Sequence, residues 1–141
     1  MFLDASAIAA VLLREEDAGS MLKAMEAARG KLRFSPVVRI EAVLALVRGR
    51  VQARGKGPAT AKDFDTATSL VDELLTELEA HEVHITTGMG REAIKALSIY
   101  GKVVGHPAQL NMGDALAYAC AKAYGVPLLY KGDDFKNTDL K

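Results

Sequence analysis

Short apolar runs and helical hydrophobic periodicity alternate along the chain. Compact or alternating apolar runs predict strands, whereas apolar residues three and four positions apart predict helices. The expected strands are 1–4, 32–34, 82–86 and 126–130. The expected helices are 6–13, 18–28, 36–47, 61–81, 90–100 and 112–124. This alternation predicts a parallel sheet that is covered by helices on both faces.

Capping residues mark the ends of several expected helices. Ser6 is a suitable N-cap for the first helix, and Ser35 followed by Pro36 is a strong helix start. Thr60 to Asp63 resembles a capping box, and Asn111 precedes the last expected helix. The segment 48–58 is rich in Gly, Arg and Lys, so we expect a loop there.

Two carboxylates stand out in the first half of the chain. Asp4 directly follows the first apolar run, and ligands bind beyond the carboxyl ends of parallel strands. A role as a helix cap would also account for Asp4. Glu41 lies in a helix that otherwise resembles core, where an unpaired carboxylate is costly unless it is paired, protonated or bound to a metal. A solvated helix face or a salt bridge to Arg39 or Arg48 would also account for Glu41.

Three further acids lie near the C-terminus. Asp114 occupies the first turn of the last expected helix, where the helix dipole alone favours an acid. Gly113 beside it is a poor helix former, which suggests that another group approaches closely there. Asp133 and Asp134 follow the last apolar run, although they also suit an ordinary turn.

Together, these acids are expected at one end of the sheet. Like charges about 4 Å apart repel by roughly 4 kcal/mol at an effective dielectric constant of about 20, so the cluster needs a compensating cation. Carboxylate oxygens without a Cys or firm His cluster favour Mg²⁺ or Mn²⁺ over zinc. The sequence therefore predicts a Mg²⁺ site, with Mn²⁺ as the alternative ion.

Four acid-bearing blocks in this order resemble those of the PIN-domain ribonucleases, specifically the VapC-type toxins of bacterial toxin–antitoxin pairs. Phe2 to Ile8 is similar to the family's start, in which an apolar run is followed by Asp, any residue, and Ser or Thr. Ser35 to Leu46 resembles the second block, and Asn111 to Ala119 resembles the third, the most specific one. Leu128 to Phe135 resembles the fourth, so the resemblance covers essentially the whole chain.

The resemblance implies one PIN-like domain over residues 1–141, a three-layer α/β/α sandwich with a central parallel sheet. It implies hydrolysis of RNA (tRNA, rRNA or mRNA) that depends on Mg²⁺ or Mn²⁺. It also implies a homodimer, and a cognate antitoxin protein that inhibits the toxin and represses their shared operon.

The same resemblance implies a role for each block. Asp4 and Asp114 would be direct metal ligands. Glu41, together with the fourth acid, would bind a second ion or hold metal-bound water. The Ser6 hydroxyl would hydrogen-bond to a carboxylate or to a coordinated water.

The fourth acid departs from the family's pattern. Many members carry it three positions before the Phe, where this chain has Gly132. Asp133 or Asp134 must therefore substitute as a catalytic residue, and we place Asp133 ahead of Asp134.

Composition narrows the class of protein. The 141 residues, half of them hydrophobic, form one globular domain with a real core. Eighteen basic residues balance eighteen acidic ones, so an RNA-binding groove would need local patches or a dimer. The single cysteine fits a reducing compartment, and no apolar run reaches the ~20 residues of a membrane span, so we expect a cytoplasmic protein. The basic residues considered for RNA contact are Arg14, Arg39, Arg48, Arg50, Arg54, Lys56, Lys131 and Lys136.

Other functions fit part of the pattern. An aspartyl phosphotransfer domain also places Asp after its first strand, but phosphatases of that class need a second Asp where this chain has Ser6. A PIN-like fold with a damaged fourth acid would act only as a binding module. A DNA-directed 5′-nuclease would use the same carboxylate chemistry, whereas the three histidines give little support to a metal-free ribonuclease.

Overall fold

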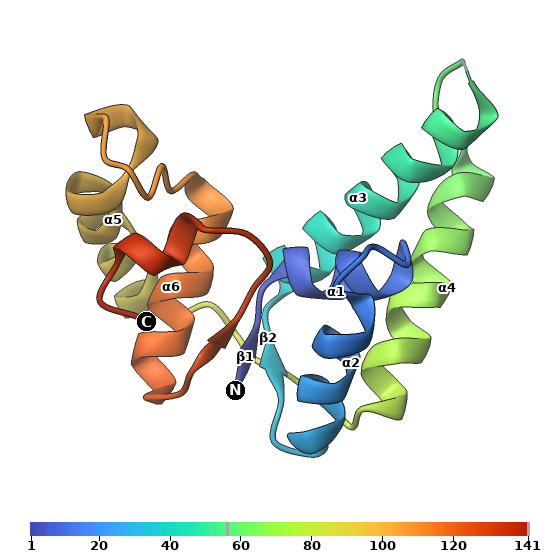
Figure 1. Ribbon diagram of the computed structural model, residues 1–141. Coiled ribbons are helices and arrows are strands. Elements are labelled where there is room, and N and C mark those ends of the chain that lie inside the picture. Colours follow the sequence, from blue (N-terminus) through green and yellow to red (C-terminus); the bar gives the residue numbers. More distant parts are fainter. Residues whose placement is uncertain (56, 141) are drawn as a thin grey trace.

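A computed structural model describes residues 1–55 and 57–140. Its centre is a four-stranded sheet in the order β3-β2-β1-β4, with every neighbouring pair parallel (Figure 1). The strands are β1 (Phe2–Leu3), β2 (Arg33–Phe34), β3 (His81–Glu82) and β4 (Leu128–Leu129). The predicted parallel sheet is confirmed.

Helices cover both sides of these strands. In Figure 1, α5 and α6 lie on one side, and α1 to α4 lie on the other, which is the predicted α/β/α sandwich. The α-helices are α1 (Ala5–Leu12), α2 (Ala18–Ala27), α3 (Pro36–Arg54), α4 (Ala61–Glu77), α5 (Thr87–Tyr100) and α6 (Met112–Tyr124). Two short 3₁₀ turns are η1 (Lys102–Val104) and η2 (Asp134–Asn137). None of the helices in the described ranges is long and apolar enough to cross a membrane.

Helix α3 is longer than the sequence pattern predicts. The expected loop over 48–58 is wrong for residues 48–54, because α3 continues to Arg54. Gly55, whose φ of 89° suits glycine, caps the helix, and Gly57 and Pro58 lie outside any helix or strand as expected. Gly49 lies within α3, where a Cβ would stand 2.9 Å from Leu13, the C-cap residue of α1, so glycine permits the close approach of the two segments. The long α3 and α4 form a hairpin that extends beyond the sheet (Figure 1).

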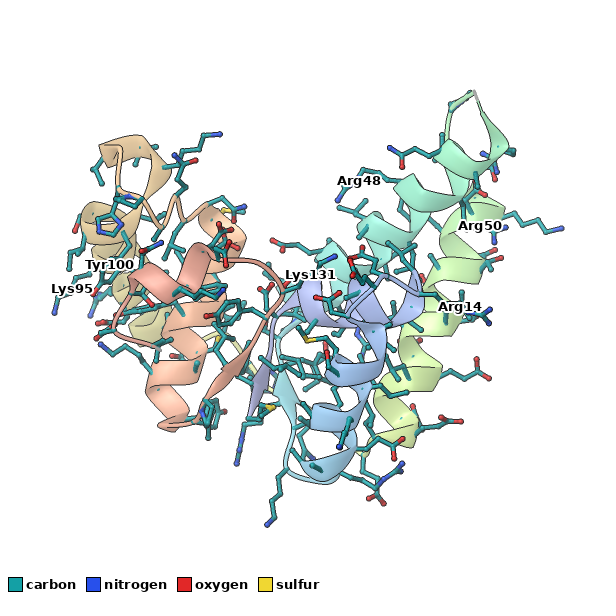
Figure 2. The ribbon with its side chains drawn as sticks, in the orientation of Figure 1. Arg14, Arg48, Arg50, Lys95, Tyr100 and Lys131 are labelled. Atoms are coloured by element: carbon teal, nitrogen blue, oxygen red, sulfur yellow. The ribbon has the colours of Figure 1, made fainter. Side chains whose placement is uncertain are left out.

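A buried carboxylate ties this hairpin together. Asp63 of α4 is 1% exposed and closes the predicted capping box with Thr60. It also accepts hydrogen bonds from Arg54, at 2.7 and 2.8 Å, and from Arg50, at 3.3 Å. Figure 2 shows Arg50 on α3 beside α4. Two candidate RNA-binding residues therefore hold the fold together.

Other boundaries shift by a few residues. Helix α4 ends at Glu77, and His81 belongs to β3, because Glu79 adopts a positive φ of 53° that turns the chain. Strand β3 covers only part of the expected strand 82–86, and α5 begins at Thr87 because Thr86 caps it. Each strand has only two residues, so the apolar runs in the sequence are longer than the strands they predict.

Small side chains bring the helices close to the sheet. Phe2 and Leu3 of β1 are fully buried, and alanines of α1 and α6 belong to the same hydrophobic core. This packing places the N-termini of α1 and α6 at the carboxyl edge of β1 and beside α3.

Candidate active site

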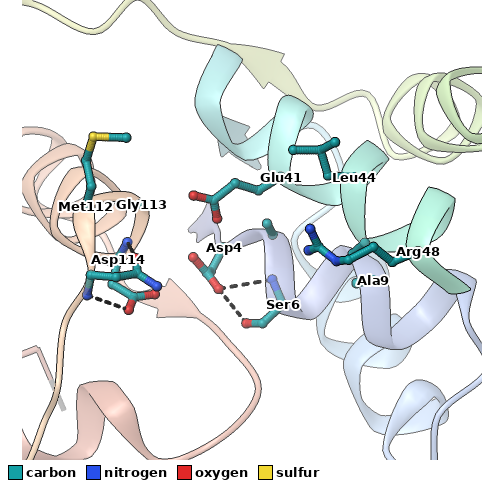
Figure 3. Close-up of a pocket in the computed structure, with 12 residues that line it drawn as sticks. Asp4, Ser6, Ala9, Glu41, Leu44, Arg48, Met112, Gly113 and Asp114 are labelled. Atoms are coloured by element: carbon teal, nitrogen blue, oxygen red, sulfur yellow. Dashed lines mark hydrogen bonds between the residues drawn. The ribbon is translucent and has the colours of Figure 1, made fainter. Parts of the chain in front are cut away.

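A pocket of about 530 Å³ opens at the carboxyl edge of β1. Its walls come from the N-terminal turns of α1 and α6 and from one face of α3 (Figure 3). The pocket brings together three acids predicted from the sequence: Asp4, Glu41 and Asp114. The remaining lining residues are Ala5, Ser6, Ala9, Leu44, Ala45, Arg48, Asn111, Met112 and Gly113.

Asp4 has two structural tasks. It is 5% exposed and serves as the N-cap of α1, a place that the sequence pattern assigned to Ser6. Its Oδ2 accepts hydrogen bonds from the Ser6 backbone N–H at 3.0 Å and from the Ser6 hydroxyl. The helix therefore starts one residue earlier than expected. Among the described residues Oδ1 has no hydrogen-bond donor, and the carboxylate faces the pocket (Figure 3).

Asp114 repeats this arrangement at the start of α6. Its Oδ2 accepts the Asn111 backbone N–H at 3.0 Å, while its own N–H donates to Asn111 Oδ1 at 2.9 Å. This reciprocal capping box holds the carboxylate at the mouth of the pocket. As in Asp4, one oxygen caps a helix and the other remains for a ligand.

Glu41 enters the pocket from the middle of α3, directly against Gly113. A Cβ at position 113 would lie 1.7 Å from Glu41 Oε1, so no larger residue fits without displacing the carboxylate. The close approach predicted from Gly113 is therefore confirmed, and the approaching group is the Glu41 side chain. The alternative of a solvated helix face for Glu41 is not what the structure shows, since the side chain is partly buried and lines the pocket.

Burial and mutual repulsion raise the pKa of all three acids. Burial is the main cause for Asp4, with a further contribution from the charge of Asp134. Burial also raises the pKa of Glu41, and the charges of Asp4 and Asp114 add to the effect. The pKa of Asp114 is raised to about 6, mainly by burial and further by the charges of Asp4 and Asp134. The site therefore resists holding several ionised carboxylates without a cation.

The tail distinguishes the two candidates for the fourth acid. The charge of Asp134, in η2, acts on both Asp4 and Asp114. Asp133 is exposed and pairs with Lys136, away from the pocket lining. Both residues are exposed and neither lines the pocket, but the effect of the Asp134 charge on the two pocket acids favours Asp134 over Asp133, the reverse of the order given by the sequence. Gly132 has a φ of 100°, a backbone conformation that an acid would adopt only with strain.

Ser6 connects the tail to the pocket. Its Oγ donates to Asp4 and accepts the backbone N–H of Lys131 at 3.0 Å. The Lys131 side chain pairs in turn with Glu15 and Asp17 in the α1–α2 connection. The predicted hydroxyl-to-carboxylate bond is present, and it also aligns the strand end that leads to Asp134.

The oxygen atoms that line the pocket are of the type that hard divalent cations prefer. Hard carboxylate oxygens line the pocket, and relief of their repulsion would favour such an ion. Across residues 1–55 and 57–140, however, no three His, Cys, Asp or Glu side chains converge closely enough to enclose a metal ion. The carboxylates share the pocket without forming a closed coordination shell.

Comparison with known proteins decides the family. The sequence profile of the PIN domain matches residues 1–141. The chain belongs to the PIN domain family. A VapC ribonuclease of Rhizobium meliloti is 48% identical over 140 residues, which cover 99% of this chain and 98% of that protein. Ribonuclease VapC42 of Mycobacterium tuberculosis is 33% identical over 141 residues, covering 100% of this chain and 97% of the relative. The resemblance to VapC ribonucleases is thus confirmed along the whole chain.

A solved structure supports the PIN fold independently. The crystal structure of Mycobacterium tuberculosis VapC20, described as a sarcin-ricin loop cleaving toxin, matches with a TM-score of 0.69. The match covers 99% of this chain and 95% of that one at 14% identity, so it bears on the fold alone.

One pocket residue of this PIN domain was not singled out by sequence reasoning. Arg48 was only one of eight basic candidates, yet it lines the same pocket as the acids. Its spacing from Glu41 was the available signal, because positions seven apart share one face of a helix. The expected loop over 48–58 concealed that signal.

Proposed function

We propose that the protein is a metal-dependent endoribonuclease and the toxin of a toxin–antitoxin pair. The observation that carries the proposal is the meeting of Asp4, Glu41 and Asp114 in one pocket, with raised pKa values and a glycine that makes room for Glu41. The full-length similarity to VapC ribonucleases supports the RNA substrate.

Asp4 and Asp114 would hold the cation, Mg²⁺ or Mn²⁺, through the oxygens that capping leaves free. Glu41 would bind the ion as well or hold a coordinated water, and Asp134, whose charge acts on Asp4 and Asp114, would take the same role as the fourth acid. Rotation of the Glu41 side chain would bring its oxygens toward the free oxygens of Asp4 and Asp114, because the backbone already places these three residues around one pocket. When bound, the ion would supply an acidified water and offset charge on the phosphate.

The chain's own groups would align the reaction. Capping bonds restrain the Asp4 and Asp114 side chains, so their free oxygens keep a fixed direction. The Ser6 hydroxyl holds Asp4 Oδ2 and lowers the pKa of that carboxyl against the effect of burial, which favours the ionised form needed for a ligand. Hydrolysis by this arrangement would leave a 5′-phosphate and a 3′-hydroxyl.

The remaining parts of the proposal concern partners and setting. We expect a cognate antitoxin protein, a homodimer and a cytoplasmic location. The RNA class, whether tRNA, rRNA or mRNA, is to be found by mapping cleaved ends.

The test is cleavage of total cellular RNA by purified protein with Mg²⁺, with Mn²⁺ or with chelator. An Asp4→Ala variant prepared in the same way controls for contaminating ribonuclease. Metal-dependent cleavage that the variant lacks supports the proposal. Equal cleavage by both proteins, or none with either metal, would favour a non-catalytic binding module. A parallel DNA oligonucleotide separates ribonuclease from DNA-directed nuclease activity, and trapping of a phosphoaspartate at Asp4 would point to phosphotransfer.

A further inference from the structure

We propose that Arg48 binds a phosphate group of the RNA at the end of the pocket away from Asp114. This inference deepens the proposed ribonuclease function and rests on it. It gives the substrate chain two points of contact, one phosphate at the carboxylates and another at Arg48 on α3.

The position of Arg48 on α3 points to this role. It lies seven residues beyond Glu41, so the two share a helix face at about two turns' separation, roughly 10 Å along the axis. Helical side chains lean toward the N-terminus, which directs the Arg48 guanidinium back toward Glu41. Both line the pocket (Figure 3), and the Arg48 charge counteracts the raised pKa of Glu41.

Ion pairing sets Arg48 apart from the other basic candidates. Arg39 pairs with Asp72 and Glu82, and Lys131 pairs with Glu15 and Asp17. Arg50 and Arg54 pair with Asp63, and Lys136 pairs with Asp133. Lys56 lies outside the described residues. Within the described chain Arg48 has neither an ion pair nor a hydrogen bond, and Arg14, which is also unpaired there, does not line the pocket.

The surroundings of Arg48 leave its side chain open to a ligand. Arg48 is exposed to solvent beside Leu44, Ala45 and Ala9, the apolar part of the pocket lining, so an RNA strand can reach its guanidinium. Gly49, the next residue, packs against Leu13 and so anchors this turn of α3 to α1. A guanidinium on a fixed helix is well suited to a phosphate, because two of its N–H groups can donate to two phosphate oxygens.

Arg48 is not simply a partner of the acids. The pocket contains three carboxylates, yet no pairing of Arg48 with any of them occurs among the described contacts. Its guanidinium therefore stays available while the acids are left for a cation. An RNA strand across the pocket would therefore contact the metal-binding carboxylates at one end of the pocket and Arg48 at the other.

The test uses a fluorescein-labelled, mixed-sequence single-stranded RNA and measures anisotropy over a series of salt concentrations. Chelator and an Asp114→Asn background prevent hydrolysis during binding. Arg48→Ala and Arg48→Lys are compared with Lys95→Ala, which removes the same charge from an exposed position on α5, far from the pocket (Figure 2). Cleavage in Mg²⁺ is measured with the same substitutions in protein that retains Asp114.

We expect Arg48→Ala to weaken RNA binding about tenfold and to reduce the slope of log affinity against log salt by about 0.7. Arg48→Lys restores the salt slope and part of the affinity, since it keeps the charge without the two-pronged geometry. Lys95→Ala leaves both unchanged. Loss of affinity should also appear as a raised KM in cleavage.

Three results would overturn the inference. Affinity and salt slope in Arg48→Ala that match those of Lys95→Ala would show that no phosphate is bound there. An unchanged slope with a lower melting temperature in chelator would make Arg48 only a counter-ion of the acids. Wild-type protein that neither binds nor cleaves RNA would overturn the proposed function itself, which separates the two failures.

Discussion

Gly113 of α6 gives Glu41 of α3 the room in which its carboxylate lies. The two residues are remote in sequence, and a Cβ on the first would stand 1.7 Å from Oε1 of the second. The nearest atoms of Glu41 all belong to its carboxyl group, at the flexible end of the side chain. The contact therefore constrains the position of the acid more than the packing of the helices.

Gly113→Ala should accordingly impair activity and spare stability. The added methyl group displaces the Glu41 carboxylate, and misplacement of a reacting group by about 1 Å costs on the order of a hundredfold in rate. Alanine also favours the helix, so the melting temperature should stay level or rise. Gly90→Ala in α5 is the matched control, because nothing lies within 4 Å of a Cβ there. Equal RNA cleavage by the two variants would contradict the role of this contact.

Asp114→Asn should stabilise the metal-free protein at neutral and higher pH. The folded state raises the pKa of Asp114 to about 6, whereas an unfolded Asp titrates near ~4. Because the folded form holds its proton more tightly, this group destabilises the fold progressively as pH rises from about 4 to about 6. Asparagine removes the charge and can still accept the Asn111 N–H.

Thermal melts in chelator at pH 4 and pH 8 check this expectation. The variant should melt higher than wild type at pH 8, and the difference should vanish at pH 4. Added Mg²⁺ should raise the melting temperature of wild type more at pH 8 than at pH 5, since protons compete with the ion for the same carboxylates. In Asp114→Asn this rise in melting temperature should be smaller. A variant that melts lower than wild type at pH 8 would refute the assigned repulsion.

Asp134→Asn should lower the rate of RNA cleavage and Asp133→Asn should not. The charge of Asp134 reaches Asp4 and Asp114, whereas Asp133 pairs with Lys136 outside the pocket. We expect a loss of at least about tenfold for the first variant, in the range typical of one group that positions a reactant. Both substitutions remove one charge from neighbouring positions, so each serves as the control of the other. The opposite order of effects would restore Asp133 as the fourth acid.

Asp63→Asn should destabilise the α3–α4 hairpin without altering the chemistry. Arg54, Thr60 and Arg50 hydrogen-bond to this buried carboxylate and hold its pKa well below the usual range. A depressed pKa contributes stability above pH ~4 that is lost as the pH falls below it, so the cost of the substitution should shrink in acid. We expect a melting temperature several degrees lower at pH 7. Asp65→Asn, at an exposed site on the same helix, should change little.

Much of the candidate site was predictable because its acids sit at positions that local rules single out. Asp4 follows a strand, Asp114 follows a capping residue, and Gly113 is out of place in a helix. The sequence could not show that Asp4 and Asp114 act both as caps and as pocket residues. That division depends on which carboxylate oxygen each backbone N–H meets.

By itself, the sequence determined the alternation of strands and helices, the parallel sheet and the three acids, since periodicity and capping chemistry are local. Only the tertiary structure decided how far α3 extends, because packing of Gly49 on Leu13 overrides the loop preference of a Gly-rich segment. It likewise favoured Asp134 over Asp133 and distinguished Arg48 from the other cations. Those choices depend on distances between distant segments, which no local pattern encodes.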